Sequence, residues 1–372
     1  MRLSPESILR ELVAIPTPSG ISNLPFLNWI AGKLEPIGWE VRLLPYQDIA
    51  GIFKANLIAR PVSCADRDQI DLAFVCHTDT VPYAADWINA LSLVECKGRL
   101  HGCGSCDVKG ALACFLAAVF HIPQDRIDSG VALILTADEE IGCQGMERLL
   151  ASTALRIASA IVSEPTSLRP GIAGKGYGLA KITVQGKEAH SAFPNQGVSA
   201  ISIAARLVSS IEDRFAPVLT DALFDPPRTT LNIGLIEGGT AKNIIPGSCT
   251  FLVEWRGIPG EDPSSLVAQI EELVAQAHRG EQGTSIKLEI LRSEPGFSPK
   301  SSGPLQQRLA KLISQTPVGI SFGSEASRLS RIAEEVIVIG PGDMQTAHSN
   351  RECVPVAELE NWTSILKILL QK

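Results

Sequence analysis

A histidine and an aspartate stand two positions apart where an apolar run of the sequence ends. His77 and Asp79 close the stretch DLAFVCHTD, residues 71–79. Side chains two positions apart in a strand lie on one face, and an imidazole that binds a metal ion commonly has its second nitrogen held by a carboxylate. Alone the pair is weak evidence, because such a histidine is more often structural; with further ligands it would form one side of a metal site.

Two glutamates follow a second apolar run. Glu139 and Glu140 come directly after GVALILTAD, residues 130–138. Because adjacent side chains diverge, one carboxylate could bind a metal ion while its neighbour stays free as a general base. An isolated pair of this kind would more often be a solvated acidic loop, so it too needs further ligands.

Three further side chains of metal-ligating type stand in separate loops. They are Asp107 in GCGSCDVKG, Glu164 in VSEPT and His348 in GPGDMQTAHSN. With His77 and Glu140 they make two histidines and three carboxylates. This donor set suits two zinc-like ions that share a bridging carboxylate, whereas calcium would not favour the histidines.

The elements that must position these residues alternate along the first part of the chain. The order strand, helix, strand, helix, strand is predicted over residues 71–79, 110–122, 130–140, 145–152 and 158–165. This order is typical of a largely parallel sheet with helices on its faces. Ligands of such sheets gather at the carboxyl ends of the strands, which is where the polar clusters HTD, DEE and SEPT stand.

The pattern changes between residues 174 and 291 to strand, helix, strand, strand, helix, strand. This is the split β-α-β arrangement, typical of a small ferredoxin-like domain. The prediction is therefore an α/β protein in two parts. A discontinuous metal-binding catalytic domain, residues 1–173 and 292–372, carries a mostly parallel twisted sheet flanked by helices, and a smaller α+β domain, residues 174–291, is inserted in it.

Composition narrows the classes of partner. The chain has 372 residues, a formal charge of −7 and no lysine or arginine clusters of the kind that bind nucleic-acid phosphates or anionic lipid. It has no apolar run of about 18 residues that could span a membrane. We therefore expect neither a nucleic-acid nor a membrane partner. Nine scattered cysteines without a secretory signal favour reduced thiols in the cytoplasm.

The motifs together resemble the ordered motif series of the zinc-dependent M20 metallopeptidases, over nearly the whole chain. The stretches are HTDTVP (77–82), GCGSCDVKG (102–110), ADEEIGCQG (137–145), SEPTSLRP (163–170), GKEAHSAFPNQGVSAI (186–201), GGTAKNIIPGS (238–248) and GPGDMQTAH (340–348). Within the family, SEPT, GKGYG, SEAS and GPGDMQTAH resemble the acetylornithine deacetylase branch. The resemblance implies hydrolysis of an N-acylated amino acid. The favoured reaction is the hydrolysis of N2-acetyl-L-ornithine to ornithine and acetate, in arginine biosynthesis.

The resemblance also implies roles for the metal-site residues. His77 and Glu164 would bind one ion, Glu140 and His348 the other, and Asp107, followed by a cis peptide bond, would bridge them. Zinc is the favoured metal, with cobalt or manganese as alternatives. Glu139 would be the general base, and Asp79 would orient His77.

The smaller domain is implied to act as a lid and dimerisation module of a homodimer. His190 would reach into the partner's active site and bind the scissile carbonyl oxygen, with Asn243 as its helper. Arg256 would pair with a substrate carboxylate, or form an ordinary salt bridge. Lys175 would line the site or cap a domain hinge.

Glu325, in FGSEASRL, is a candidate for substrate choice. A carboxylate there could pair with the side-chain ammonium of ornithine. The branch typically has threonine where this chain has Ser324, so a neutral substrate side chain such as that of citrulline stays open.

Three other interpretations stay open. The chain could be another M20 hydrolase, such as an acetylcitrulline deacetylase, a succinyl-diaminopimelate desuccinylase, an aminoacylase or a dipeptidase. It could be a binding protein that keeps the fold without metals, although every ligand is present. It could be a redox protein that uses Cys103 and Cys106, although we expect these thiols to be bystanders in the loop of Asp107.

Overall fold

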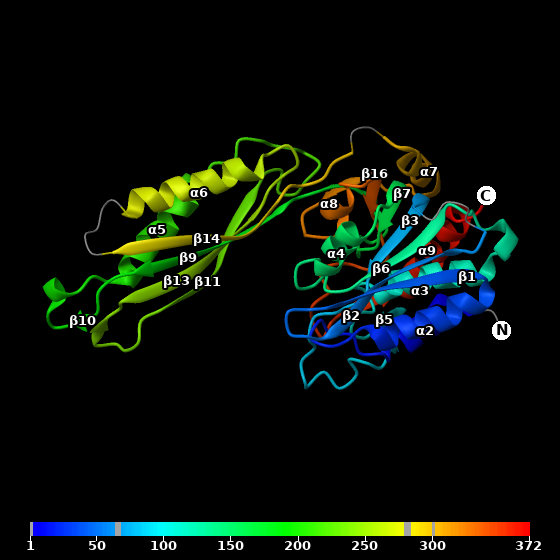
Figure 1. The fold of residues 1–372 in the computed structure, drawn as a ribbon, viewed down its shortest axis with the longest axis horizontal. Helices are drawn as coiled ribbons and strands as arrows, with labels where there is room; N and C mark the ends of the chain where they lie inside the picture. The colour runs from blue at the N-terminus through cyan, green and yellow to red at the C-terminus, as the bar shows by residue number, and fades with distance from the viewer. Residues whose placement is uncertain (1–2, 64–67, 279–283, 300–301) are drawn as a thin grey trace. The chain divides into compact units, whose positions relative to one another are not determined.

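Two compact units make up the chain in the computed structural model, which describes residues 3–63, 68–278, 284–299 and 302–372. Unit 1 comprises Met1–Ile172, Pro299–Val318 and Ser324–Lys372, and unit 2 comprises Ala173–Ser298 and Gly319–Gly323. Figure 1 shows the elements of both. The limits 174 and 291 predicted for the inserted domain stay a prediction.

The main sheet has eight strands. In spatial order they are β1 Trp39–Gln47, β2 Phe53–Pro61, β6 Val131–Thr136, β3 Gln69–His77, β7 Arg156–Val162, β16 Ala333–Val338, β8 Gly171–Gly174 and β15 Val318–Ile320. The central strands β6, β3, β7 and β16 run parallel, whereas β1, β2 and β8 join the sheet antiparallel. The predicted fold class is confirmed; the β1–β2 hairpin at one edge was not predicted.

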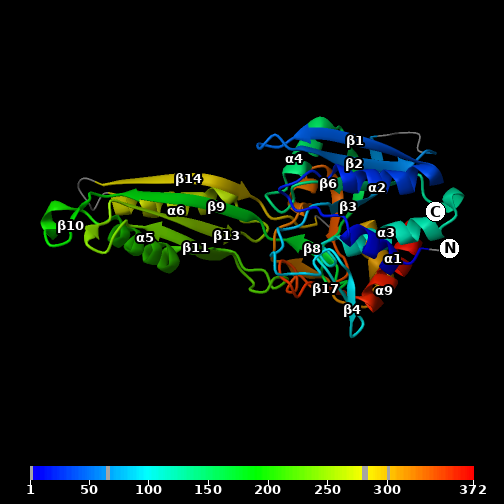
Figure 2. The ribbon, with the colours of Figure 1, turned by 90° about the horizontal axis from the view of Figure 1, so that it is seen from below.

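The helices of unit 1 bury the apolar side chains of this sheet. They are α1 Pro5–Val13, α2 Leu24–Leu34, α3 Lys109–His121, α4 Gln144–Ser152, α7 Pro304–Leu312, α8 Ala326–Leu329 and α9 Val356–Leu369. Helix α3 is apolar and buried over almost its whole length, and it packs with α1 and α9 (Figure 2). Phe115 of α3 stacks on Phe74 of β3 with ring centroids 4.6 Å apart. This contact fixes the helix that follows Asp107 against the strand that ends at His77.

Unit 2 has its own four-stranded antiparallel sheet. Its strands, in spatial order, are β11 Thr230–Gly238, β13 Ser248–Arg256, β9 Tyr177–Gln185 and β14 Ser285–Glu294. Every second residue of β9 and β13 is buried against α5 Ala200–Arg214 and α6 Pro263–His278, in a core that includes Phe251 and Trp255. The order β-α-β-β-α-β is the one predicted.

Short elements complete both units. They are β4 Val94–Cys96, β5 Arg99–His101 and β17 Cys353–Pro355, which form one small sheet, β10 Ala189–His190 and β12 Ile244–Ile245, which form another, and the 3-10 turns Glu35–Ile37, Gln124–Arg126 and Pro194–Gln196. Where the chain enters and leaves unit 2, Gly174 and Phe297 exchange two main-chain hydrogen bonds of 2.9 and 3.0 Å. None of the helices that the structure describes is both long and apolar enough to cross a membrane.

Candidate metal centre

Polar side chains follow three neighbouring parallel strands at the same edge of the sheet. His77 is the last residue of β3, Glu139 and Glu140 follow β6, and Glu164 follows β7. In the sheet β3 lies between β6 and β7, and His77 stands opposite Thr136 at the end of β6. The carboxyl ends of the strands thus bring these side chains together, as the sequence predicts.

Asp107 lies between two imidazoles. Its Oδ1 is 3.0 Å from Nε2 of His77, and its Oδ2 is 3.2 Å from Nε2 of His348. A carboxylate with each oxygen facing a different histidine has the geometry needed to bridge two cations. The peptide bond from Asp107 to Val108 is cis, as expected.

Glu140 completes the exposed end of this cluster. Nε2 of His348 lies 3.1 Å from both Glu140 oxygens. The side chain of His348 is 50% exposed, whereas that of His77 is only 2% exposed. His348 also has a left-handed backbone with φ 55°, a conformation that is uncommon outside glycine and concentrates at functional sites.

Glu164 adds a buried carboxylate to the same group. It is 3% exposed, and burial together with the charge of Asp107 raises its pKa well above its ordinary value. Burial of several carboxylates at one point is unfavourable unless a cation compensates their charge. Ligand atoms of His77, Asp107 and Glu140 lie within 4.8 Å of one another, so the residues present fit a divalent metal ion.

Asp79 contacts both His77 and the loop of the two glutamates. Its main-chain oxygen lies 3.0 Å from Nδ1 of His77, a contact that leaves Nε2 to face the ligands. Its carboxylate accepts hydrogen bonds from the N–H groups of Glu139 (3.0 Å) and Glu140 (3.2 Å) and from the Ser19 hydroxyl (2.8 Å). Asp79 thus holds the turn that carries the predicted base.

Glu139 has the surroundings of a proton-transfer group. Burial raises its pKa to about 8, and the charges of Glu140 and Glu325 act in the same direction. A carboxyl group titrating near neutral pH can both take and return a proton; the charge of a bound cation would lower this pKa. The thiol of Cys143 lies 3.2 Å from Glu139 Oε1 and donates to it.

A buried ion pair directly before Glu139 is a feature that the sequence analysis missed. Lys54 of β2 is 1% exposed and pairs with Asp138, which is fully buried. Asp138 has a left-handed backbone with φ 59°, and it also accepts a 2.8 Å hydrogen bond from the Tyr46 hydroxyl. The available signal was a lysine inside the apolar stretch KANLIAR.

Glu325 is buried in unit 1. It is 1% exposed, and its Oε2 accepts a 2.7 Å hydrogen bond from the hydroxyl of Thr136 at the end of β6. Within the described part of the chain its Oε1 has no hydrogen-bond partner. Burial raises its pKa to about 7.

The remaining predicted site residues lie in unit 2. His190 is exposed on β10, which pairs with β12, and Asn243 immediately precedes β12. The N–H of Ser191 donates to the main-chain oxygen of Asn243 at 3.0 Å. The fold therefore makes His190 and Asn243 neighbours, although 53 positions separate them in the sequence.

Arg256 and Lys175 both have partners within unit 2. Nε of Arg256 donates to Glu254 at 2.7 Å, and its guanidinium lies 4.3 Å from the centre of the Tyr177 ring. Nζ of Lys175, which is 4% exposed, donates to the main-chain oxygens of Pro226 (3.0 Å) and Arg228 (2.7 Å). The side chain of Arg256 is 28% exposed, whereas the ammonium of Lys175 points at main-chain oxygens.

The two cysteines of the Asp107 loop are buried and free. Burial raises the pKa of Cys103 to about 11 and that of Cys106 well above its ordinary value. A redox-active thiol instead needs a lowered pKa. Cys64, one of the nine cysteines, lies outside the described residues.

The fold of the chain is shared with solved structures of M20 metallopeptidases. The structure resembles a tripeptidase of Staphylococcus aureus, with a TM-score of 0.80 at 21% identity, over 100% of this chain and 98% of that one. It also resembles an M20 family metallo-carboxypeptidase of Sulfolobus solfataricus, with a TM-score of 0.78 at 17% identity, over 98% of both chains. Residues 172–281 match the family described as Peptidase dimerisation domain.

Two relatives narrow this class. The sequence is 39% identical to the acetylornithine deacetylase of Myxococcus xanthus, over 96% of this chain and 94% of that protein. It is 29% identical to the acetylornithine deacetylase of Proteus mirabilis, over 98% of this chain and 95% of that protein. The chain therefore belongs to the acetylornithine deacetylase family of M20 metallohydrolases. As a member, it is a hydrolase that acts on amide bonds.

Proposed function

We propose that this chain hydrolyses N2-acetyl-L-ornithine to ornithine and acetate, as a step of arginine biosynthesis. The observation that carries the proposal is the 39% identity to the Myxococcus xanthus acetylornithine deacetylase over 96% of the chain. The grouping of His77, Asp107 and Glu140 supports it, because these residues can hold the metal that such hydrolysis uses.

The proposed metal content is two divalent ions. Zinc is the favoured metal, with cobalt or manganese as alternatives. His77 and Glu164 would hold one ion, and Glu140 and His348 the other. Asp107 would be shared, which its position between the two histidines supports. Bound divalent ions lower the pKa of a water molecule and polarise the carbonyl that it attacks.

Glu139 is the proposed general base. It takes a proton from the attacking water as the tetrahedral intermediate forms, and it then gives that proton to the nitrogen of the departing amine. The same carboxyl group serves both steps because the proton returns within one catalytic cycle. Asp79 supports this role by holding the main-chain N–H groups of Glu139 and Glu140.

Unit 2 is proposed to act as a lid and to form a homodimer, with residues 174–291 as the inserted domain. The match of residues 172–281 to a dimerisation domain supports this. His190, helped by Asn243, would donate a hydrogen bond to the scissile carbonyl oxygen in the partner subunit. One such donor contributes roughly 3 kcal/mol to the stability of the transition state.

Substrate recognition is assigned to three further residues. Arg256 would pair with the α-carboxylate of the substrate, for which a planar guanidinium is suited. Glu325 would receive the side-chain ammonium of ornithine; its Oε1, without a partner among the described residues, supports this role. Lys175 is a weaker candidate, because its ammonium already donates to two carbonyl oxygens.

We place the enzyme in the cytoplasm. The eight described cysteines are free, which fits a reducing compartment.

A substrate panel on protein of defined metal content tests the function. We expect the highest kcat/KM with N2-acetylornithine, lower values with N-acetylcitrulline, and the lowest with N-succinyl-diaminopimelate. A preference for acetylcitrulline would replace the proposed substrate and point to the surroundings of Glu325. Absence of bound metal and indifference to chelators would instead revive the binding-protein interpretation.

A further inference from the structure

A carboxylate outside the predicted ligand set lies against the loop that carries Asp107. Glu352 is 3% exposed. Its Oε1 accepts hydrogen bonds from the main-chain N–H groups of Cys106 and Asp107, both at 3.0 Å, and its Oε2 accepts from the N–H of Gly104 at 2.9 Å. Glu352 was not among the residues identified from the sequence.

We propose that Glu352 is a positioning residue. By accepting three main-chain hydrogen bonds from the Asp107 loop, it holds that loop in place and so sets the metal affinity of the centre. This inference rests on the proposed role of Asp107 as a metal ligand. The three N–H groups converge on one side chain, an arrangement that binds an anion.

Within the described part of the chain, these three N–H groups have no acceptor other than Glu352. Gly104, Cys106 and Asp107 are all buried, and a buried N–H without an acceptor is costly. Gly104 has φ 74°, and a Cβ there would lie 2.9 Å from Thr80. The backbone path that points the three donors at Glu352 is therefore tightly constrained, and that path sets the direction of the Asp107 carboxylate.

Glu352 also joins two ligand loops. It stands four positions after His348, and its own main-chain oxygen accepts a hydrogen bond from the N–H of Gly102. One segment thus supplies a predicted ligand and holds the loop that supplies another. The 3.2 Å approach of His348 to Asp107 is the geometry that this connection maintains.

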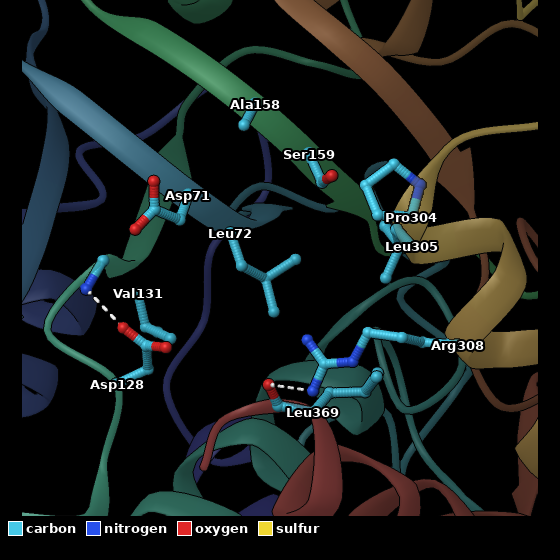
Figure 3. A pocket seen from close by; sticks show the side chains of 11 residues that line it. Asp71, Leu72, Asp128, Val131, Ala158, Ser159, Pro304, Leu305, Arg308 and Leu369 are labelled. Carbon is cyan, nitrogen blue, oxygen red and sulfur yellow. Dashed lines mark hydrogen bonds between the residues drawn. The ribbon is translucent and has the colours of Figure 1, made fainter. Parts of the chain in front are cut away.

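Unit 1 contains a matched control. Glu335 of β16 is 6% exposed, and it accepts hydrogen bonds from the N–H groups of Leu305 and Gln306, both at 2.8 Å, and from the hydroxyl of Ser159 at 3.1 Å. It caps the start of α7. Figure 3 shows Ser159 and Leu305 at a pocket lined also by Asp71 and Val131, near the amino ends of β3 and β6 and so away from the ligands.

The experiment compares Glu352→Gln with Glu335→Gln, each prepared without metal and titrated with Zn²⁺ by competition against a chelating dye. We expect Glu352→Gln to weaken Zn²⁺ binding about 10- to 100-fold, and Glu335→Gln to leave it within about twofold of the wild type. Both variants should lower the midpoint of thermal unfolding of the metal-free protein, because a glutamine has one acceptor oxygen where each glutamate uses both of its oxygens.

Glu352→Asp is the second variant, since it keeps a carboxyl group with two oxygens but is one methylene shorter. We expect it to weaken Zn²⁺ binding less than Glu352→Gln does, and it decides the question if the glutamine variant does not fold. Wild-type affinity in the variants at Glu352, or equal losses in the Glu352 and Glu335 variants, would overturn the proposal.

The titration uses no substrate, so it separates this proposal from the proposed function. A wild-type chain that binds Zn²⁺ but does not hydrolyse N2-acetylornithine would count against the substrate alone. A wild-type chain that binds no divalent cation would overturn the role of Glu352 together with the metal centre.

Discussion

At the scale of single residues, Glu139 and Glu140 are neighbours with different contacts. Glu140 faces His348, whereas Glu139 accepts a hydrogen bond from the Cys143 thiol. Their divergence supports the division of roles that the sequence predicts, one carboxylate for metal and one for the proton.

Glu139→Gln tests this division. It should lower kcat by about 100- to 10,000-fold because the proton acceptor is lost, while metal content measured by atomic emission stays that of the wild type. Glu140→Gln is the comparison and should lose metal as well as activity. Unchanged turnover in Glu139→Gln would remove this residue from the reaction.

Metal binding should depend on pH through His348. Hydrogen bonds to Asp107 and Glu140 raise the pKa of this imidazole to about 10 in the metal-free protein, so the ring is protonated at neutral pH. A metal ion binds only the neutral ring and must release that proton. The apparent association constant should therefore rise with pH, by about tenfold per pH unit for each proton released, from about pH 6 to about pH 8.

Calorimetry in buffers of different ionisation enthalpy measures this proton release directly. His348→Ala should release fewer protons than the wild type. Release of no proton by the wild-type protein at neutral pH would contradict the assignment.

At the scale of elements, the ion pair between Lys54 of β2 and Asp138 anchors the turn before Glu139. Lys54→Met leaves the buried Asp138 carboxylate without its cation, and loss of one partner of such a pair costs about 3–5 kcal/mol. Urea unfolding should show this loss in the free energy of unfolding. Lys287→Met is the control, because the Lys287–Glu289 pair is exposed and such pairs contribute little.

A second substitution shows whether the unpaired charge of Asp138 causes the loss of stability. Adding Asp138→Asn to Lys54→Met should recover part of the stability, since it removes the unpaired charge. If the double variant is no more stable than Lys54→Met, lost packing of the lysine stem accounts for the effect.

Sequence reasoning predicted the elements with strong local patterns. The run VALILT and the helix KGALACFLAAVFH have apolar patterns that depend only on their own residues, and they became β6 and α3. The hairpin of β1 and β2 was missed because β1 alternates weakly and mixes charged with apolar residues. The candidate metal ligands could be selected from the sequence because their residue types are chemically distinctive, and their role stays a prediction.

The supporting residues were missed for a different reason. Glu352 lies 245 positions from Asp107, and Lys54 lies 84 positions from Asp138. A glutamate or lysine whose purpose is to hold remote main chain or a remote charge has no local pattern that distinguishes it from a surface residue. Only the folded chain shows such pairings.

At the scale of the whole molecule, the proposed homodimer makes a prediction about one edge of unit 2. Strand β11 is an edge strand of its sheet and exposes Leu235 (49%) and Ile236 (50%). An apolar edge strand is a ready surface for pairing with another chain. Ile236→Asp should give monomers in light scattering after gel filtration, and activity should fall because His190 then lacks a partner active site.

The opposite edge strand, β14, supplies the control. Leu291 is 53% exposed there, and Leu291→Asp should remain dimeric and active. A dimeric Ile236→Asp variant would move the proposed interface away from β11, and an active monomer would contradict the role of His190 in the partner.

The paired hydrogen bonds between Gly174 and Phe297 have an evolutionary consequence. Because the ends of this long segment lie against each other, the host chain would need only a tight turn to close the gap if the segment were deleted or exchanged. Most of unit 2 is therefore one continuous insertion with adjacent ends, which we call a cassette. Only Gly319–Gly323 comes from a later part of the chain. Related genes could gain, lose or replace such a cassette in one recombination event while the ligand-bearing sheet kept its path.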